Sequence, residues 1–262
     1  MNLSLTGTRA LVGGSTQGIG RASAVVLARL GATVTLIARD PEALAQTAAA
    51  LPAEGGQRHD FVTADFAEPD IVRDIVADAL GDGRRYEILI NNTGGPKGGP
   101  AIDADEEQYV AAFRMHLSCN QVLAQALVPG MKDAGYGRII NIISTSVREP
   151  IPGLGVSNTI RGAVASWAKT ISNELAPFGI TVNNVLPGFT ETTRLASLIR
   201  SKAEARGTSE DAIADEMKAG VPAARFATAE EVANAFSFFA SPAAGYVTGQ
   251  SLAVDGGRLG SI

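Results

Sequence analysis

Short runs of apolar residues alternate with segments of helical periodicity along the whole chain. The apolar runs are too short for helices and rich in β-branched residues, so they predict strands that are buried on both faces. The expected strands are Ala10–Val12, Thr33–Ile37, Arg58–Val62, Ile88–Ile90, Arg138–Ile143, Thr181–Val185 and Ser251–Val254. The expected helices are Ile19–Leu30, Pro41–Leu51, Pro69–Leu80, Glu106–Lys132, Ser157–Leu175 and Ala229–Ala240.

Residues at the ends of these segments support the helix boundaries. Pro41 and Pro69 stand at expected first turns, each after an acidic residue, and Gly31 follows its helix as a C-terminal cap does. Strands that follow one another through helices imply parallel pairing with right-handed crossovers. We therefore expect an α/β fold, with residues 1–262 forming a single Rossmann-like domain whose doubly wound parallel sheet has about seven strands and helices on both faces.

The composition of the chain indicates which binding partners and which cellular compartment to expect. The 262 residues are 45% hydrophobic, and no linker or charge run divides them, which favours one domain. A formal charge of −5 argues against nucleic acid or an anionic membrane as a partner. Cys119 is the single cysteine and cannot form an internal disulfide, so we expect the protein to be in a reducing compartment. We expect Cys119 itself to be a small core residue. Residues 1–8 lack a signal-peptide pattern and no apolar run reaches ~18 residues, so a cytoplasmic protein without a membrane span is expected.

The loop after the first expected strand is rich in glycine and leads straight into a helix. It reads Gly13-Gly14-Ser15-Thr16-Gln17-Gly18-Ile19-Gly20. Gly14 permits a tight turn, Gly18 lets the backbone approach a pyrophosphate, and Gly20 allows the helix to pack closely on the strand. A glycine-rich loop alone is also compatible with an ordinary turn, but between a strand and its helix it predicts a dinucleotide site.

Further motifs follow in a fixed order. They are Asp65 after the third expected strand, Asn91-Asn92-Thr93-Gly94 after the fourth, Pro187-Gly188 with Thr192 after the sixth, and Asp255-Gly256-Gly257 near the end of the chain. With the glycine-rich loop, this series resembles the short-chain dehydrogenase/reductase family, in its 3-oxoacyl-reductase-like branch. The resemblance implies oxidation or reduction of a small-molecule carbonyl or alcohol, with no metal, and a homotetramer or homodimer built through the two longest helices. It also implies a nicotinamide cofactor bound by Gly14, Ser15, Gln17, Gly18, Ile19, Gly20, Asp65, Asn92, Gly94, Pro187, Gly188 and Thr192.

The choice between the two nicotinamide cofactors depends on the end of the second expected strand. An NAD site needs a carboxylate there to accept hydrogen bonds from the ribose, and a carboxylate would repel a 2′-phosphate. The chain has Ala38 and then Arg39, whose guanidinium suits a phosphate dianion. We therefore expect NADP, with NAD as the alternative if Arg39 is only a solvated surface charge.

The reacting centre departs from the family at three positions. Counting with the family's spacing from Ser144, which binds the substrate carbonyl in the family, places Ser157 at the tyrosine, Arg161 at the lysine and His116 at the asparagine. Arg161 remains a cation able to hold the nicotinamide ribose, but a pKa above ~12 keeps it out of proton transfer. His116 is either a relocated acid/base, since the usual histidine pKa is near ~6.5, or a side chain bonded to backbone at a helix kink. A water held by Ser144 and Ser157 is the other candidate proton donor.

Substrate identity is expected to reside in a lid at about residues 191–221, where Gly207 separates two short helices over the cofactor. Lys97, in the glycine-rich loop on the same side, is either a contact for an anionic substrate or a solvated lysine. Three functions remain open. They are an NADP(H)-dependent carbonyl reductase or alcohol dehydrogenase with an atypical proton donor, an NADP(H)-binding sensor or partner without turnover, and a non-redox lyase similar to the halohydrin dehalogenases.

Overall fold

A parallel β-sheet forms the centre of the computed structural model, which describes residues 1–81 and 83–261. Within these residues seven strands pair in the order β3-β2-β1-β4-β5-β6-β7, all in parallel. The strands are β1 (Arg9–Gly13), β2 (Thr33–Ala38), β3 (Asp60–Thr63), β4 (Ile88–Asn91), β5 (Gly137–Ile142), β6 (Ile180–Pro187) and β7 (Ser251–Val254). The predicted doubly wound sheet is confirmed, and the carboxyl ends of its strands share one edge.

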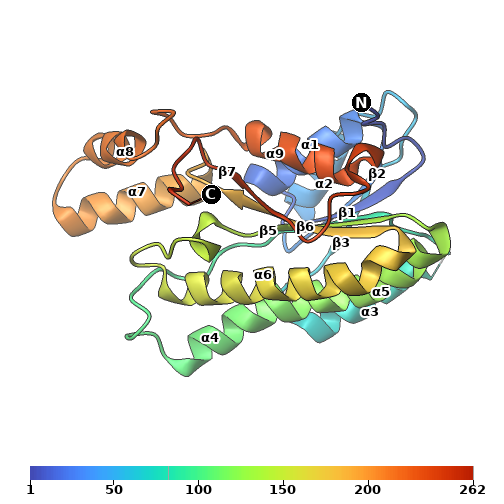
Figure 1. Cartoon of the computed structure of the whole chain (residues 1–262), viewed down its shortest axis with the longest axis horizontal. Coiled ribbons are helices and arrows are strands. Elements are labelled where there is room, and N and C mark those ends of the chain that lie inside the picture. Colours follow the sequence, from blue (N-terminus) through green and yellow to red (C-terminus); the bar gives the residue numbers. More distant parts are fainter. Residues whose placement is uncertain (82, 262) are drawn as a thin grey trace.

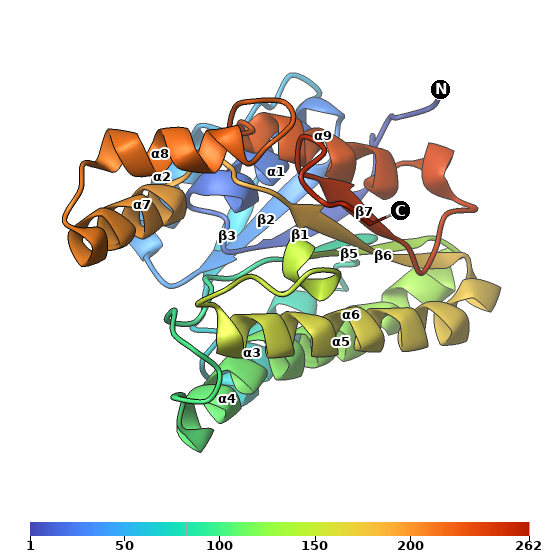
Figure 2. The ribbon, with the colours of Figure 1, turned by 60° about the vertical axis from the view of Figure 1, so that its left-hand side comes forward.

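Helices cover both faces of the sheet. They are α1 (Gly18–Arg29), α2 (Pro41–Ala49), α3 (Pro69–Leu80), α4 (Glu106–Phe113), α5 (Cys119–Ala134), α6 (Gly155–Leu175), α7 (Thr193–Arg206), α8 (Glu210–Ala219) and α9 (Ala229–Ala240). Figures 1 and 2 show α1, α2 and α9 on one face, with α3, α5 and α6 on the other. Two apolar clusters fill the space between these layers and the sheet. The helices α7 and α8 project beyond the sheet, on the side of the strand ends (Figure 1).

The two edge strands differ from the prediction that every strand is buried on both faces. In β3 exposed residues alternate with partly buried ones, β7 has one exposed residue among partly buried ones, and Phe61 and Leu252 are 37% and 42% exposed. The central strands β1, β4 and β5 are buried almost throughout. An edge strand has a neighbour on one side only, so its short apolar run is covered incompletely.

The longest predicted helix, Glu106–Lys132, is interrupted by one turn of different geometry. Residues Arg114–Ser118 form a π-helix between α4 and α5, and His116 lies within it. A π-helical turn accommodates one extra residue without breaking the helix, so the apolar spacing along the chain does not reveal it.

Helix ends follow the expected chemistry. Pro41 and Pro69 lie in the first turns of α2 and α3, and Gly31 adopts a φ of 103° just after α1. Gly207 has a φ of 61° and ends α7, so two helices follow the β6 loop, with a glycine between them. These helices lie within the segment expected to form a lid.

Candidate functional site

The glycine-rich loop forms a tight turn between β1 and α1. Gly14 and Gly18 adopt positive φ values of 55° and 53°, which side chains other than glycine rarely adopt. A Cβ atom at Gly20 would lie 2.2 Å from the backbone oxygen of Gly14 and 2.6 Å from Nδ2 of Asn92. The first turn of α1 can therefore approach the end of β1 only because residue 20 has no side chain.

We expect Gly20→Ala to destabilise the fold. Overpacking of this kind typically costs about 1–3 kcal/mol, because the loop must shift to admit the methyl group. Gly162→Ala in α6 is the matched control, since a Cβ there would meet nothing within 4 Å and alanine gains about 0.5–1 kcal/mol in a helix interior. Urea unfolding measures both changes, and equal effects of the two variants would contradict the packing role of Gly20.

Two polar side chains complete this loop. Asn92 donates hydrogen bonds from Nδ2 to the carbonyl oxygens of Gly13 and Gly14, at 3.1 and 3.2 Å, and so holds the turn against the end of β4. Ser15 is fully buried, and its hydroxyl has no partner among the described residues. A buried donor without a partner beside the N-terminus of α1 suits an anionic phosphate. These features fit the pyrophosphate of a dinucleotide.

The loop after β6 lies against the glycine-rich loop. A Cβ atom at Gly18 would lie 3.2 Å from Cγ2 of Thr192, and the Thr193 hydroxyl donates to the Gln17 amide oxygen at 3.1 Å. Thr192 also caps α7 by accepting from the Leu195 amide at 3.3 Å. The structure thus brings Thr192 and the glycine-rich loop together, as expected of a shared cofactor site.

Pro187 and Gly188 lie at the end of β6 and directly after it. A Cβ atom at Gly188 would lie 2.7 Å from the Cα atom of Asp255, which packs the two loops tightly. Gly94 lies after β4, where a Cβ would meet nothing within 4 Å, and Ile19 in the first turn of α1 packs against the core. These predicted cofactor residues all lie at the carboxyl edge of the sheet.

At the end of β2, Arg39 projects into solvent, with its side chain 75% exposed. Its nearest described carboxylate is Asp65, at 3.9 Å, and Asp65 also accepts a hydrogen bond from the Ala67 amide at 2.9 Å. Arg39 directly follows β2 and Asp65 lies just after β3, at the carboxyl ends of neighbouring strands, where the sequence predicts contacts to the adenosine half of the cofactor. The long ion pair leaves the Arg39 guanidinium available to a phosphate.

Ser144, Ser157 and Arg161 lie near the ends of the central strands. Ser144 follows β5, and its Oγ accepts a hydrogen bond from the Ser146 amide at 3.1 Å, which orients the hydroxyl. Ser157 and Arg161 are four positions apart on α6 and therefore share one face of it. Arg161 donates from Nη1 to the carbonyl oxygen of Ile142 at 2.8 Å, beside Ser144.

Arg161 is less basic than the sequence suggests. Burial and the positive charge of Arg194 lower the pKa of its guanidinium to about 10, whereas we expect a value above ~12 from an arginine in water. The side chain still carries its charge at neutral pH. It therefore remains a fixed cation and not a group that exchanges a proton during turnover.

His116 is not suited to act as an acid. It is 2% exposed, and its Nε2 has no partner among the described residues. Burial and the charge of Arg161 lower the pKa of the imidazole to about 2, so it stays neutral at physiological pH. This low pKa argues against His116 as a relocated acid/base. The alternative hypothesis is that His116 bonds to backbone at a helix kink, and its Nε2 makes no such hydrogen bond to the described residues.

The buried His116 predicts a specific loss of stability in acid. Its pKa is about 2 in the folded state and near 6.5 in the unfolded chain, so the unfolded chain binds the proton more readily and the unfolding free energy falls as the pH drops below about 6.5. Between pH 7 and pH 5 this contribution amounts to about 2 kcal/mol. Urea unfolding measures this difference. On going from pH 7 to pH 5, the unfolding free energy of the wild type should fall by about 2 kcal/mol more than that of His116→Gln. Parallel pH dependence in the two proteins would exclude a buried neutral imidazole.

The predicted role of Cys119 as a core residue agrees with the structure. The thiol is 1% exposed and donates to the carbonyl oxygen of Phe66 at 3.0 Å. Burial raises its pKa to about 12, so the reactive thiolate does not form at neutral pH.

A ladder of side-chain amides, which the sequence did not lead us to expect, crosses four strands. Asn91 donates to Asn141 at 2.8 Å, Asn141 donates to Asn184 at 2.9 Å, and Asn184 donates to the Ser251 hydroxyl at 3.1 Å. The strand register places these residues side by side on one face of the sheet. The available signal was a polar residue at the same depth in successive apolar strands.

Arg194, at the start of α7, is a second candidate site residue that was not expected from the sequence. Its guanidinium donates to the carbonyl oxygens of Gly95 and Pro96, at 3.2 and 2.8 Å, and so ties α7 to the loop after β4. An exposed arginine in a charged segment gives no sequence signal of such a contact.

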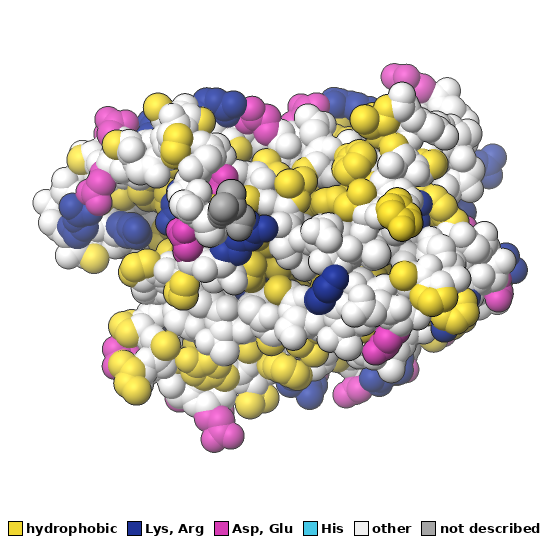
Figure 3. Space-filling view, in the orientation of Figure 1, with side chains coloured by type: hydrophobic (Ala, Val, Ile, Leu, Met, Phe, Trp, Pro, Cys, Tyr) yellow, Lys and Arg dark blue, Asp and Glu magenta, His cyan; other side chains and the backbone are white. Residues whose placement is uncertain are grey.

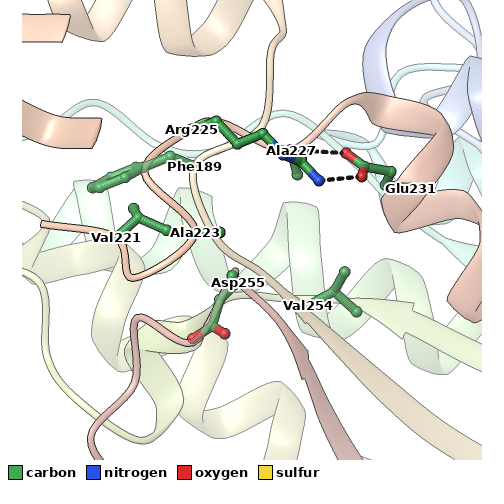
Figure 4. A pocket seen from close by; sticks show the side chains of 9 residues that line it. Phe189, Val221, Ala223, Arg225, Ala227, Glu231, Val254 and Asp255 are labelled. Carbon is green, nitrogen blue, oxygen red and sulfur yellow. Dashed lines mark hydrogen bonds and ion pairs between the residues drawn. The ribbon is translucent and has the colours of Figure 1, made fainter. Parts of the chain in front are cut away.

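A small pocket lies beside this region, between the loop after β6 and the end of β7. Phe189, Val254 and Asp255 line it, and the ion pair between Arg225 and Glu231 closes one side, at 2.6 Å (Figure 4). Its volume of about 100 Å³ is too small for a dinucleotide. It therefore belongs to the packing of the loops around the cleft.

Residues 1–81 and 83–261 contain neither a metal-binding cluster nor a helix suited to span a membrane. No group of three or more His, Cys, Asp or Glu side chains could hold a metal ion there. No helix in the same residues is long and apolar enough to cross a membrane.

The known proteins that this chain resembles in sequence and in structure are reductases and dehydrogenases. A family model described as enoyl-(acyl carrier protein) reductase matches residues 14–258. The chain is 32% identical over 257 residues to the 3-oxoacyl-[acyl-carrier-protein] reductase of Synechocystis sp., covering 97% of this chain and 98% of the other. The structure of L-sorbose reductase from Gluconobacter frateurii, complexed with NADPH and L-sorbose, superposes with a TM-score of 0.93 at 30% identity and full coverage of both chains. The gluconate 5-dehydrogenase of Burkholderia cenocepacia, in complex with NADP and tartrate, superposes with a TM-score of 0.88 at 31% identity, covering 100% of this chain and 98% of the other.

Proposed function

The chain belongs to the short-chain dehydrogenase/reductase family, and we propose that it is an NADP(H)-dependent oxidoreductase acting on a small-molecule carbonyl or alcohol. The observation that carries this proposal is the nucleotide cradle. The buried, unpartnered hydroxyl of Ser15 lies within a loop whose backbone requires glycine at positions 14, 18 and 20, next to the N-terminus of α1. Solved relatives of closely similar fold bind NADPH or NADP.

Residue 39 supports NADP over NAD. Ala38 ends β2 at the position where an NAD site needs a carboxylate, and Arg39 follows it with its guanidinium exposed. The pyrophosphate would be held by Ser15, Gln17, Gly18 and Ile19. The adenosine half would be held by these residues together with Arg39 and Asp65. Asn92, Gly94, Pro187, Gly188 and Thr192 would border the nicotinamide half, and Arg161 would hold its ribose.

The chain's own residues bind and orient the substrate oxygen. NADPH, when bound, supplies a hydride to the carbonyl carbon. The Ser144 hydroxyl, held by the Ser146 amide, donates to the carbonyl oxygen, where negative charge develops. Neither His116, which is neutral, nor Arg161, which stays charged, releases a proton at neutral pH. We therefore assign the proton to a water held by Ser144 and Ser157.

A nucleotide-binding protein without turnover is the second candidate. It is favoured by serine and arginine at the positions where the family's spacing places its tyrosine and lysine. The non-redox lyase has no comparable support, because this chain keeps the nucleotide loop that the halohydrin dehalogenases abandon.

Nucleotide titration followed by a turnover assay separates these functions. The purified protein is titrated with NADPH and NADH, and a panel of carbonyl compounds is then followed at the nicotinamide absorbance. We expect tighter binding of NADPH than of NADH, and turnover of at least one carbonyl. Binding without turnover of any compound would favour the sensor, and failure to bind either nucleotide would overturn both proposals.

We also propose a cytoplasmic homotetramer or homodimer, built through α4–α5 and α6. Trp167 on α6 is only partly buried, and its indole donates to Gln121 on α5 at 2.7 Å. The apolar positions on these helices exceed what one buried face needs.

A further inference from the structure

Two arginines, Arg161 and Arg194, bond to backbone near the carboxyl ends of neighbouring strands, and neither has a carboxylate partner among the described residues. Arg161 comes from α6 to the end of β5, and Arg194 comes from α7 to the loop after β4. These strands are neighbours in the sheet, and Arg194 is close enough for its charge to lower the pKa of Arg161. Neither guanidinium has a carboxylate oxygen within 4.0 Å in the described part of the chain, unlike ten other basic side chains.

Two carboxylates on the carboxyl side of the sheet bond to backbone amides near the end of the chain. Asp255 accepts hydrogen bonds from the backbone amides of Gly257 and Leu259, at 3.0 and 2.8 Å. Glu149 accepts from the Gly260 amide at 3.0 Å. These carboxylates fold the end of the chain and do not neutralise Arg194. The surface is indented between the projection of α7 and α8 and the layer of α4 and α6 (Figure 3), and Arg194 bonds α7 to the loop after β4.

Arg194 is fixed in position and keeps spare donors. Its two bonds to Gly95 and Pro96 use two of the five N–H groups of a guanidinium, which leaves three. A Cβ atom at Gly95 would lie 3.1 Å from Nη2 of Arg194, so the guanidinium lies directly on the glycine backbone. A guanidinium held in this way is preorganised for a planar, two-oxygen acceptor.

Other groups of the protein are already assigned to the cofactor pyrophosphate and to the substrate carbonyl. The glycine-rich loop and the Ser15 hydroxyl suit the pyrophosphate, and the Ser144 hydroxyl suits the substrate carbonyl. We propose that Arg194 binds a carboxylate of the substrate, so that the protein acts on hydroxy acids and oxo acids. This inference rests on the proposed oxidoreductase function and names its substrate class. Arg161 adds positive potential at the same place without needing to touch the carboxylate.

Calorimetric titration tests this proposal without requiring turnover. The wild type is first titrated with NADP⁺, and the loaded protein is then titrated with tartrate, gluconate and pyruvate, and with tartramide as the uncharged match for tartrate. Arg194→Gln is compared with Arg200→Gln, which alters an exposed arginine on the same helix that pairs with Glu210 at 3.3 Å.

We expect at least one acid to bind with a Kd in the millimolar range and tartramide to bind more weakly than tartrate. Arg194→Gln should weaken the acid roughly tenfold or more, with NADP⁺ affinity unchanged, and Arg200→Gln should change neither. Equal binding of tartramide and tartrate, or no binding of any acid, would overturn the proposal. A parallel loss of NADP⁺ and acid affinity in Arg194→Gln would assign Arg194 to the nucleotide phosphates instead. Absence of NADP⁺ binding to the wild type would overturn the oxidoreductase function, and acid titration of the nucleotide-free protein would then decide the role of Arg194 by itself.

Discussion

Ser144→Ala should lower turnover roughly 10²–10³-fold, because a single donor to a developing oxyanion is typically worth that much. NADPH affinity should stay within about twofold, since the hydroxyl is proposed to face the substrate oxygen and not the nucleotide. The Ser146 amide that orients Ser144 is a backbone group and remains in the variant. Steady-state kinetics and fluorescence titration of NADPH measure the two quantities.

Ser166→Ala is a suitable control for this experiment, because Ser166 is an exposed serine on α6. It should leave turnover and affinity unchanged. If Ser144→Ala turns over as fast as the wild type, the substrate oxygen is bound by another group and the mechanism proposed for Ser144 is wrong.

Arg39→Asp should weaken NADPH about ten- to a hundredfold and NADH far less. Losing a charge-assisted contact costs about 1.5–3 kcal/mol, and the new carboxylate would also repel the 2′-phosphate. Arg73→Asp is the matched charge reversal on α3, where Arg73 pairs with Asp70 at 2.7 Å. Equal weakening of both nucleotides by Arg39→Asp would mean that Arg39 has a structural role, and NAD would become the favoured cofactor.

The sheet and its helices were predictable from the sequence because burial of strands leaves a local pattern. Apolar runs and helical periodicity gave six helices and seven strands close to their observed positions. The exposure of β3 and β7 was not predictable in the same way. It depends on strand order, which brings segments distant in sequence together and leaves no trace in a run such as Asp60–Thr63.

The nucleotide loop was predictable for a different reason. Gly14, Gly18 and Gly20 are required by backbone geometry, and each requirement acts on a single residue type. The chemistry of His116 and Arg161 was not predictable, because their pKa values depend on burial and on a neighbour contributed by another element. Arg194 shows the same limit, since its partners lie almost a hundred positions away.

The amide ladder across β4, β5, β6 and β7 has a consequence for how the sheet can change in evolution or by design. Each of the three amides donates in the same direction along the sheet, so Asn141 and Asn184 each accept from one neighbour and donate to the next. Replacing Asn141 by an apolar residue would leave Asn91 without its acceptor and Asn184 without its donor, each in a buried position. Replacing the whole set together would remove those unpaired groups. Substitutions at these four positions should therefore be strongly epistatic. Apolar residues can replace the ladder if all four positions change together, whereas each single replacement leaves buried polar groups unpaired.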